Sequence, residues 1–82
     1  MERNIVGIRV REARRKARPS ITQGQLAARL QVMGLKVEQA AISKIERGHR
    51  PVMDFEAVAL AKALEVSVGW LLGEESEPTS SS

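Results

Sequence analysis

Apolar residues recur at the spacing of an amphipathic helix along most of this chain, and stop signals divide the pattern into short segments. The stops are Pro19, Gly34, Gly48 and Gly73, and neither an alternating strand-like pattern nor an internal repeat is present. We therefore expect an all-α fold with five short helices joined by brief connections. Their expected bounds are about residues 5–17, 23–33, 39–47, 54–64 and 68–72.

A chain of 82 residues makes one small domain, and without cysteine it has no disulfide to stabilise a core. One histidine, His49, cannot form a zinc site alone, so we expect no metal and no cofactor. Stability must come from helix packing, which the 43% hydrophobic content supports. Because no apolar run could cross a bilayer and no signal-peptide pattern opens the chain, we expect a soluble, cytoplasmic protein.

The start of the second helix carries the clearest local signal. Thr22 followed by Gln25 three residues later predicts a capping box, and Ile21 and Leu26 stand where a hydrophobic staple would lie. Helical spacing then predicts the inward residues, which include Ile5, Ile8, Leu26, Ala27, Leu30, Met33, Leu60, Ala61, Leu64, Val66, Leu71 and Leu72. In the first helix, a second apolar stripe through Val6, Val10 and Ala13 is an alternative inward set. Residues 74–82 are only Glu, Ser, Thr and Pro, so we expect a folded domain over 1–73 and a disordered tail.

The charge is divided unevenly along the chain. Residues 1–50 hold 12 Lys and Arg against 4 Asp and Glu, a formal charge of +8, whereas residues 51–82 hold 1 against 6, a charge of −5. A basic half of this size favours a polyanionic partner, most simply nucleic acid. The alternative is that the basic side chains only solvate helix surfaces.

Residues 39–48 predict a short helix with two different faces. Ile42 and Ile45 fall on an apolar stripe with Ala41, and Gly48 supplies a left-handed stop. The opposite face carries Gln, Ala, Ser, Lys and Arg, with no long acidic or large apolar residue. Such a face suits a DNA major groove, because Gln and Lys reach base edges while Ala and Ser permit close approach. The competing interpretation is an ordinary surface helix with a solvated polar face.

Several runs of the chain together resemble the phage-repressor/Cro-type (lambda-repressor-like) helix-turn-helix DNA-binding family. The runs are Thr22-Gln23, Leu26-Ala27, Ile42-Ser43-Lys44-Ile45-Glu46-Arg47-Gly48 and Leu60-Ala61-Lys62-Ala63-Leu64-Glu65-Val66-Ser67. The resemblance covers roughly residues 5–72 and implies a compact five-helix domain whose third helix lies in the major groove. The connection from Leu30 to Glu38 is longer than the common family pattern, which implies an extended turn. The segment of residues 15–20, before Ile21, is also slightly longer than in the common family pattern.

The resemblance assigns roles to particular residues. Base reading falls to Gln39, Ala40, Ser43 and Lys44, and phosphate binding to Gln23, Arg47, His49 and Arg50. Arg14 and Glu46 match the positions of a structural ion pair, and helical spacing independently places Glu46 at the border between core and solvent.

The function expected from these features is sequence-specific binding of double-stranded DNA by a transcriptional regulator, most simply a dimeric repressor at an operator. The alternative is a protein-interaction module, such as the neutralising partner of a toxin, with the acidic residues 51–82 as its surface.

We expect no enzyme activity, because no activated nucleophile, phosphate loop or metal-ligand cluster is present. Neither a membrane partner nor a small-molecule effector is expected. The sequence is compatible with a whole regulator and with the N-terminal part of a longer one.

Overall fold

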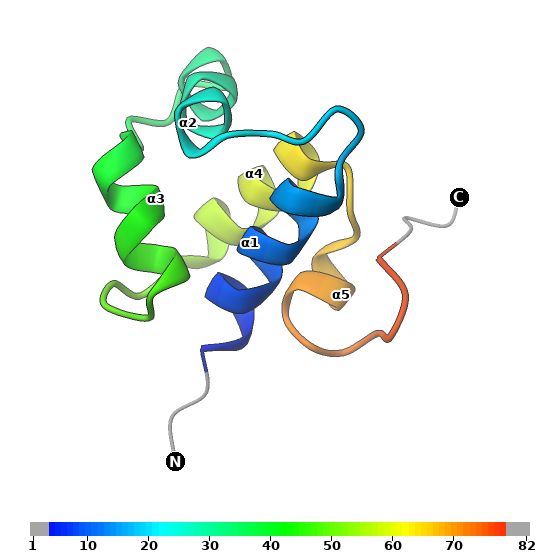
Figure 1. Ribbon diagram of the computed structural model, residues 1–82. Coiled ribbons are helices and arrows are strands. Elements are labelled where there is room, and N and C mark those ends of the chain that lie inside the picture. The colour runs from blue at the N-terminus through cyan, green and yellow to red at the C-terminus, as the bar shows by residue number, and fades with distance from the viewer. Residues whose placement is uncertain (1–3, 79–82) are drawn as a thin grey trace.

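The computed structural model describes residues 4–78, and all of their regular structure is helical (Figure 1). The helices are α1 (Ile5–Lys16), α2 (Gln23–Val32), α3 (Gln39–Glu46), α4 (Asp54–Leu64) and α5 (Val68–Leu71). The all-α prediction is confirmed, and every helix ends within one residue of its predicted end. Over the described part of the chain, no helix combines the length and the apolar character needed to cross a membrane.

Local capping explains where the helices begin and end. Thr22 and Gln25 form the predicted capping box: the Gln25 N–H donates to Thr22 Oγ1 at 3.0 Å, and the Thr22 N–H donates to Gln25 Oε1 at 2.9 Å. Asn4 caps α1 by accepting from the Gly7 N–H at 3.1 Å. Gly48 follows α3 with a φ of +76°, a conformation that side chains with a Cβ rarely adopt.

The core forms where α1 and α2 pack against α3 and α4, with α5 packed against α1 and α4. In Figure 1, α1 runs in front of α4, with α3 on one side of it and α5 on the other, while α2 packs against α3 and α4. The most deeply buried side chains come from all five helices, namely Val10, Leu26, Leu30, Ile42, Ile45, Leu60 and Leu71. Because α3 buries only its Ile42–Ile45 side, the rest of this short helix is left at the edge of the molecule.

Three residues predicted to face inward are instead exposed: Ile8 by 59%, Met33 by 41% and Leu72 by 47%. In α1 the inward stripe runs through Val10 and Ala13, a phase that turns Ile8 to the opposite side. Met33 and Leu72 are the C-cap residues of α2 and α5, where the chain leaves the helix and its packing.

Part of the segment expected to be a disordered tail lies against α5. The Glu74 and Glu75 N–H groups donate to the Gly69 carbonyl at 2.7 and 3.2 Å, and the Ser67 N–H donates to the Pro78 carbonyl at 3.0 Å. Arg9 joins this contact: its guanidinium lies 4.7 Å from the centroid of the Trp70 ring and donates to the Trp70 and Glu75 carbonyls. Residues 79–82 of the expected tail lie outside the described residues.

Gly7 allows α1 to approach the end of α3, and we expect Gly7→Ala to lower the free energy of unfolding by about 1–3 kcal/mol. Gly7 is buried, and a Cβ there would clash with the Ile45 carbonyl oxygen and the Asn4 side chain. Gly24→Ala in α2 is the matched control, since a Cβ there would lie 3.5 Å from Gln39 Oε1, an ordinary contact.

Urea unfolding of both variants checks this prediction. Gly24→Ala should be neutral or stabilising by up to about 1 kcal/mol, because alanine favours a helix over glycine. Equal stability of the Gly7→Ala variant and the parent protein would show that α1 and α3 are not in close contact.

Candidate nucleic-acid interface

The two faces predicted for α3 are separated in the structure. Ile42 and Ile45 are 0% and 1% exposed, so one side of the helix is buried in the core. The outer side carries exposed Gln39, Ala40 and Lys44 with half-buried Ser43. These four residues lie at positions i, i+1, i+4 and i+5 and therefore share one face. The residues predicted to read bases thus lie on one outward face of α3, on which three of the four side chains are polar.

The C-terminal end of α3 is held by a buried ion pair. Arg14 of α1 donates from Nε to Glu46 Oε2 at 2.7 Å and from Nη2 to Glu46 Oε1 at 2.9 Å. The two side chains are only 12% and 4% exposed. Arg14 also donates from Nη1 to the Ile21 carbonyl at 3.0 Å, which extends the network to the residue before the N-cap of α2. A bidentate pair of this kind fixes direction as well as distance, so α1 orients the C-terminal end of α3.

The start of α2 contributes to the same network through Gln23. Its side-chain amide donates from Nε2 to Glu46 Oε1 at 3.1 Å, and the residue is half-buried. Gln23 was predicted as a phosphate contact, whereas here its amide nitrogen is used to hold Glu46. The next residue, Gly24, lies close to the Gln39 side chain. The first turns of α2 and α3 are therefore neighbours, and α2 supports both ends of α3.

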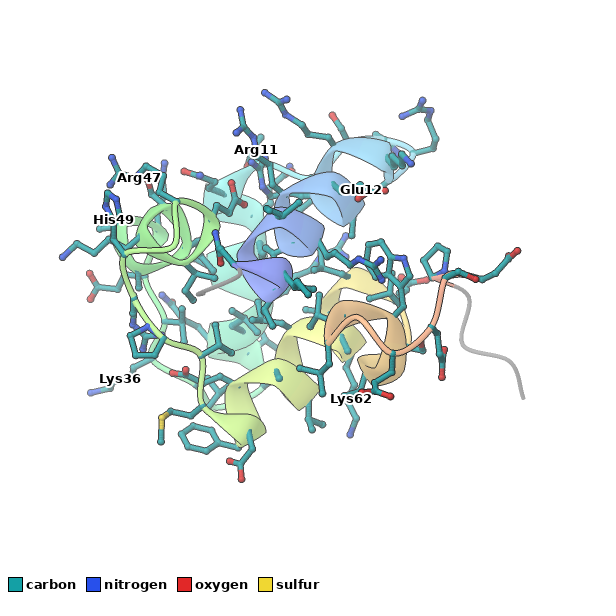
Figure 2. All side chains as sticks on the ribbon, turned by 90° about the horizontal axis from the view of Figure 1, so that it is seen from below. Arg11, Glu12, Lys36, Arg47, His49 and Lys62 are labelled. Atoms are coloured by element: carbon teal, nitrogen blue, oxygen red, sulfur yellow. The ribbon has the colours of Figure 1, made fainter. Side chains whose placement is uncertain are left out.

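Among the remaining predicted phosphate contacts, Arg47 and His49 differ from Arg50. Arg47 and His49 are exposed and extend outward on the same side of the molecule (Figure 2). Arg50 is instead paired with Glu56 of α4: Nη1 donates to Oε1 at 3.1 Å and Nη2 to Oε2 at 2.9 Å. The Glu56 side chain is 9% exposed and that of Arg50 is 32% exposed. Arg50 therefore has a structural role that the sequence analysis missed.

A signal for this pair was present at the start of α4. Glu56 is the third residue of the helix, where a carboxylate can accept from the N-cap backbone, and it does accept from the Met53 N–H at 3.0 Å. That bond fixes the carboxylate over the loop that contains Arg50. The hydrogen bonds from Arg50 are the main reason why the pKa of Glu56 is lowered, and the same bonds raise the pKa of Arg50.

The lowered pKa predicts how stability depends on pH. The folded state binds a proton at Glu56 more weakly than the unfolded chain does. Ionised Glu56 therefore stabilises the folded state at pH values above the ordinary glutamate pKa of about 4.3. This contribution is lost as the pH falls through the folded pKa. We expect Glu56→Gln to be less stable than the parent protein near pH 7, with the difference shrinking below about pH 4. Urea unfolding between pH 7 and pH 3 measures it, and a pH-independent difference would contradict the assignment.

One comparison with known proteins found a match, which agrees with the helical fold. The family model described as Helix-turn-helix matches residues 10–71, which include most of α1 and all of α2 to α5. No curated protein and no solved structure was found to match the chain.

Proposed function

The chain belongs to the helix-turn-helix family of DNA-binding regulators, and from this premise we propose that it is a repressor that reads an operator with α3. The observation that carries the proposal is the outer face of α3, where the polar residues Gln39, Ser43 and Lys44 lie together with the small residue Ala40. Gln and Lys supply the donors and acceptors that distinguish base pairs in the major groove, and Ala40 leaves room for close approach or meets a thymine methyl.

The rest of the site is suited to positioning the protein on the phosphate backbone. Arg47 and His49 are exposed just beyond the end of α3, where they would reach the strand beside the groove. The Arg14–Glu46 pair and Gln23 hold α3 at a fixed angle to α1 and α2. Rigid support of this kind is needed because base contacts depend on accurate placement of the helix.

We propose further that the protein binds DNA as a homodimer in the cytoplasm. One small domain offers few base contacts, and two domains double them. The described domain measures 32 × 28 × 21 Å. Reading two half-sites on one side of the duplex requires the two α3 helices to lie about 34 Å apart, a distance that two domains of this size can span.

Selection of bound sequences from random duplex DNA tests the proposal directly. We expect enrichment of a palindromic consensus, with affinity that falls steeply as salt rises because phosphate contacts release counterions. Sedimentation with the selected duplex should give two protein chains for each site. A protein-interaction module would enrich no consensus and would bind random DNA weakly, and that outcome would end the regulator proposal.

A further inference from the structure

The turn between α2 and α3 fixes the direction of one lysine that the proposed site does not yet include. The Gly34 and Leu35 N–H groups donate to the Gln31 and Leu30 carbonyls, both at 2.9 Å, so the turn is tied to the end of α2. Leu35 packs against the core and Val37 is only 4% exposed. Because the residues on either side of it point inward, Lys36 is exposed and directed away from the core.

Lys36 faces a surface hollow beside α3. The residues that line this hollow are Lys36, Glu38, Ala40, Ala41, Lys44 and Arg50, so the turn and the base-reading face border the same space. Neither Lys36 nor Lys44 takes part in an ion pair among residues 4–78, whereas the charge of Arg50 is balanced by Glu56. Glu38 is the one acidic residue lining the hollow, which therefore carries two unpaired lysines against one carboxylate.

The position of Lys36 differs from that of the other proposed phosphate contacts. In Figure 2, Lys36 lies on the same side of the molecule as Arg47 and His49 but at a distance from them along that side. Arg47 and His49 follow the last turn of α3, whereas Lys36 precedes its first turn. A helix that lies in the major groove has a phosphate strand on each side of it. Cations before and after α3 are therefore placed to meet phosphates at two separate points.

We propose that Lys36 binds a DNA phosphate and that the extended turn adds a backbone contact beside the base-reading face. This inference rests on the proposed function, since it needs α3 in the major groove. It assigns the turn a binding role in addition to joining two helices. Because a phosphate contact carries no sequence information, Lys36 should add affinity at every site alike.

The test compares Lys36→Ala with Lys62→Ala on the selected duplex and on random duplex. Lys62 is an exposed lysine of α4 and lies on a different part of the surface from Lys36 (Figure 2). Losing one phosphate contact should reduce the slope of log affinity against log salt by about 0.9 and weaken binding about eightfold at 0.1 M salt. Lys62→Ala should leave both quantities unchanged, and Lys36→Arg should restore most of the slope.

Each outcome separates the inference from the function on which it rests. If the parent protein binds duplex DNA and Lys36→Ala behaves like Lys62→Ala, the Lys36 contact is wrong while the regulator proposal stands. If Lys36→Ala changes the preferred sequence and leaves the slope intact, Lys36 touches a base and the phosphate assignment is wrong. If the parent protein shows no salt-dependent binding to any duplex, both proposals fail. Circular dichroism of the exposed-site variants checks that all of them are folded.

Discussion

Arg14→Ala is expected to lower the free energy of unfolding by about 3–5 kcal/mol, because it leaves the Glu46 carboxylate buried without its cation. Glu46 is 4% exposed on its side chain and would keep only the single bond from Gln23. A domain of 82 residues has a total stability of roughly 4–12 kcal/mol, so this one change removes a large part of it. Urea unfolding measured by circular dichroism gives the value.

Two companion variants separate the ion pair from simple loss of packing. Arg14→Lys keeps the charge but cannot make the bidentate contact, so its stability should lie between that of the parent protein and Arg14→Ala. The double variant Arg14→Ala with Glu46→Ala removes both charges and should cost less than the sum of the two single changes. Strict additivity of the two costs would show that Arg14 and Glu46 do not interact, and would contradict the observed geometry.

The fold could be predicted from the sequence because its signals are local. The capping box at Thr22 and Gln25 and the glycine at the end of α3 each fix a helix end with residues only a few positions apart. Local pattern gave the wrong prediction for Ile8, because α1 carries two apolar stripes and the structure buries the one that contains Val10. Which stripe faces inward depends on how α1 sits against α3, α4 and α5, and no local pattern contains that information.

The candidate site also has features that could be predicted from the sequence and features that were not predicted. The outward face of α3 follows from helical spacing, because burying Ile42 and Ile45 leaves the opposite side exposed. The Arg50–Glu56 pair and the Arg9 contact with Trp70 join residues across loops or from opposite ends of the chain. The Arg9 contact depends on tertiary packing, so charge and helical phase did not predict it. The Arg50 pair did have a local signal, the position of Glu56 in the first turn of α4, which the prediction did not use.

The packing contacts change how the predicted DNA residues should be tested. Arg50→Ala would expose a buried carboxylate as well as remove a cation, so weaker DNA binding by that variant would mix two effects. Arg47 is exposed and makes no side-chain hydrogen bond among the described residues, which makes it a cleaner probe of phosphate binding. Variants at the exposed face of α3 are similarly free of structural cost.

Gln39→Ala and Lys44→Ala together are expected to weaken binding to the preferred site by about 2–6 kcal/mol, with about half of the loss from each change. Both residues are exposed, so the protein should remain as stable as the parent. Base contacts serve only the preferred sequence, so binding to random duplex should fall much less. Competition binding with the selected site and with random duplex measures the ratio, and a new selection should return a relaxed consensus.

Arg47→Ala provides the contrast that makes this prediction decisive. A phosphate contact serves all sequences equally, so this variant should weaken both duplexes alike and reduce the salt slope by about 0.9 while the consensus stays the same. If the Gln39 and Lys44 changes also weakened every duplex equally, these side chains would be backbone contacts and α3 would not read the sequence. The loss of discrimination, rather than the loss of affinity, is therefore the quantity that identifies α3 as the recognition helix.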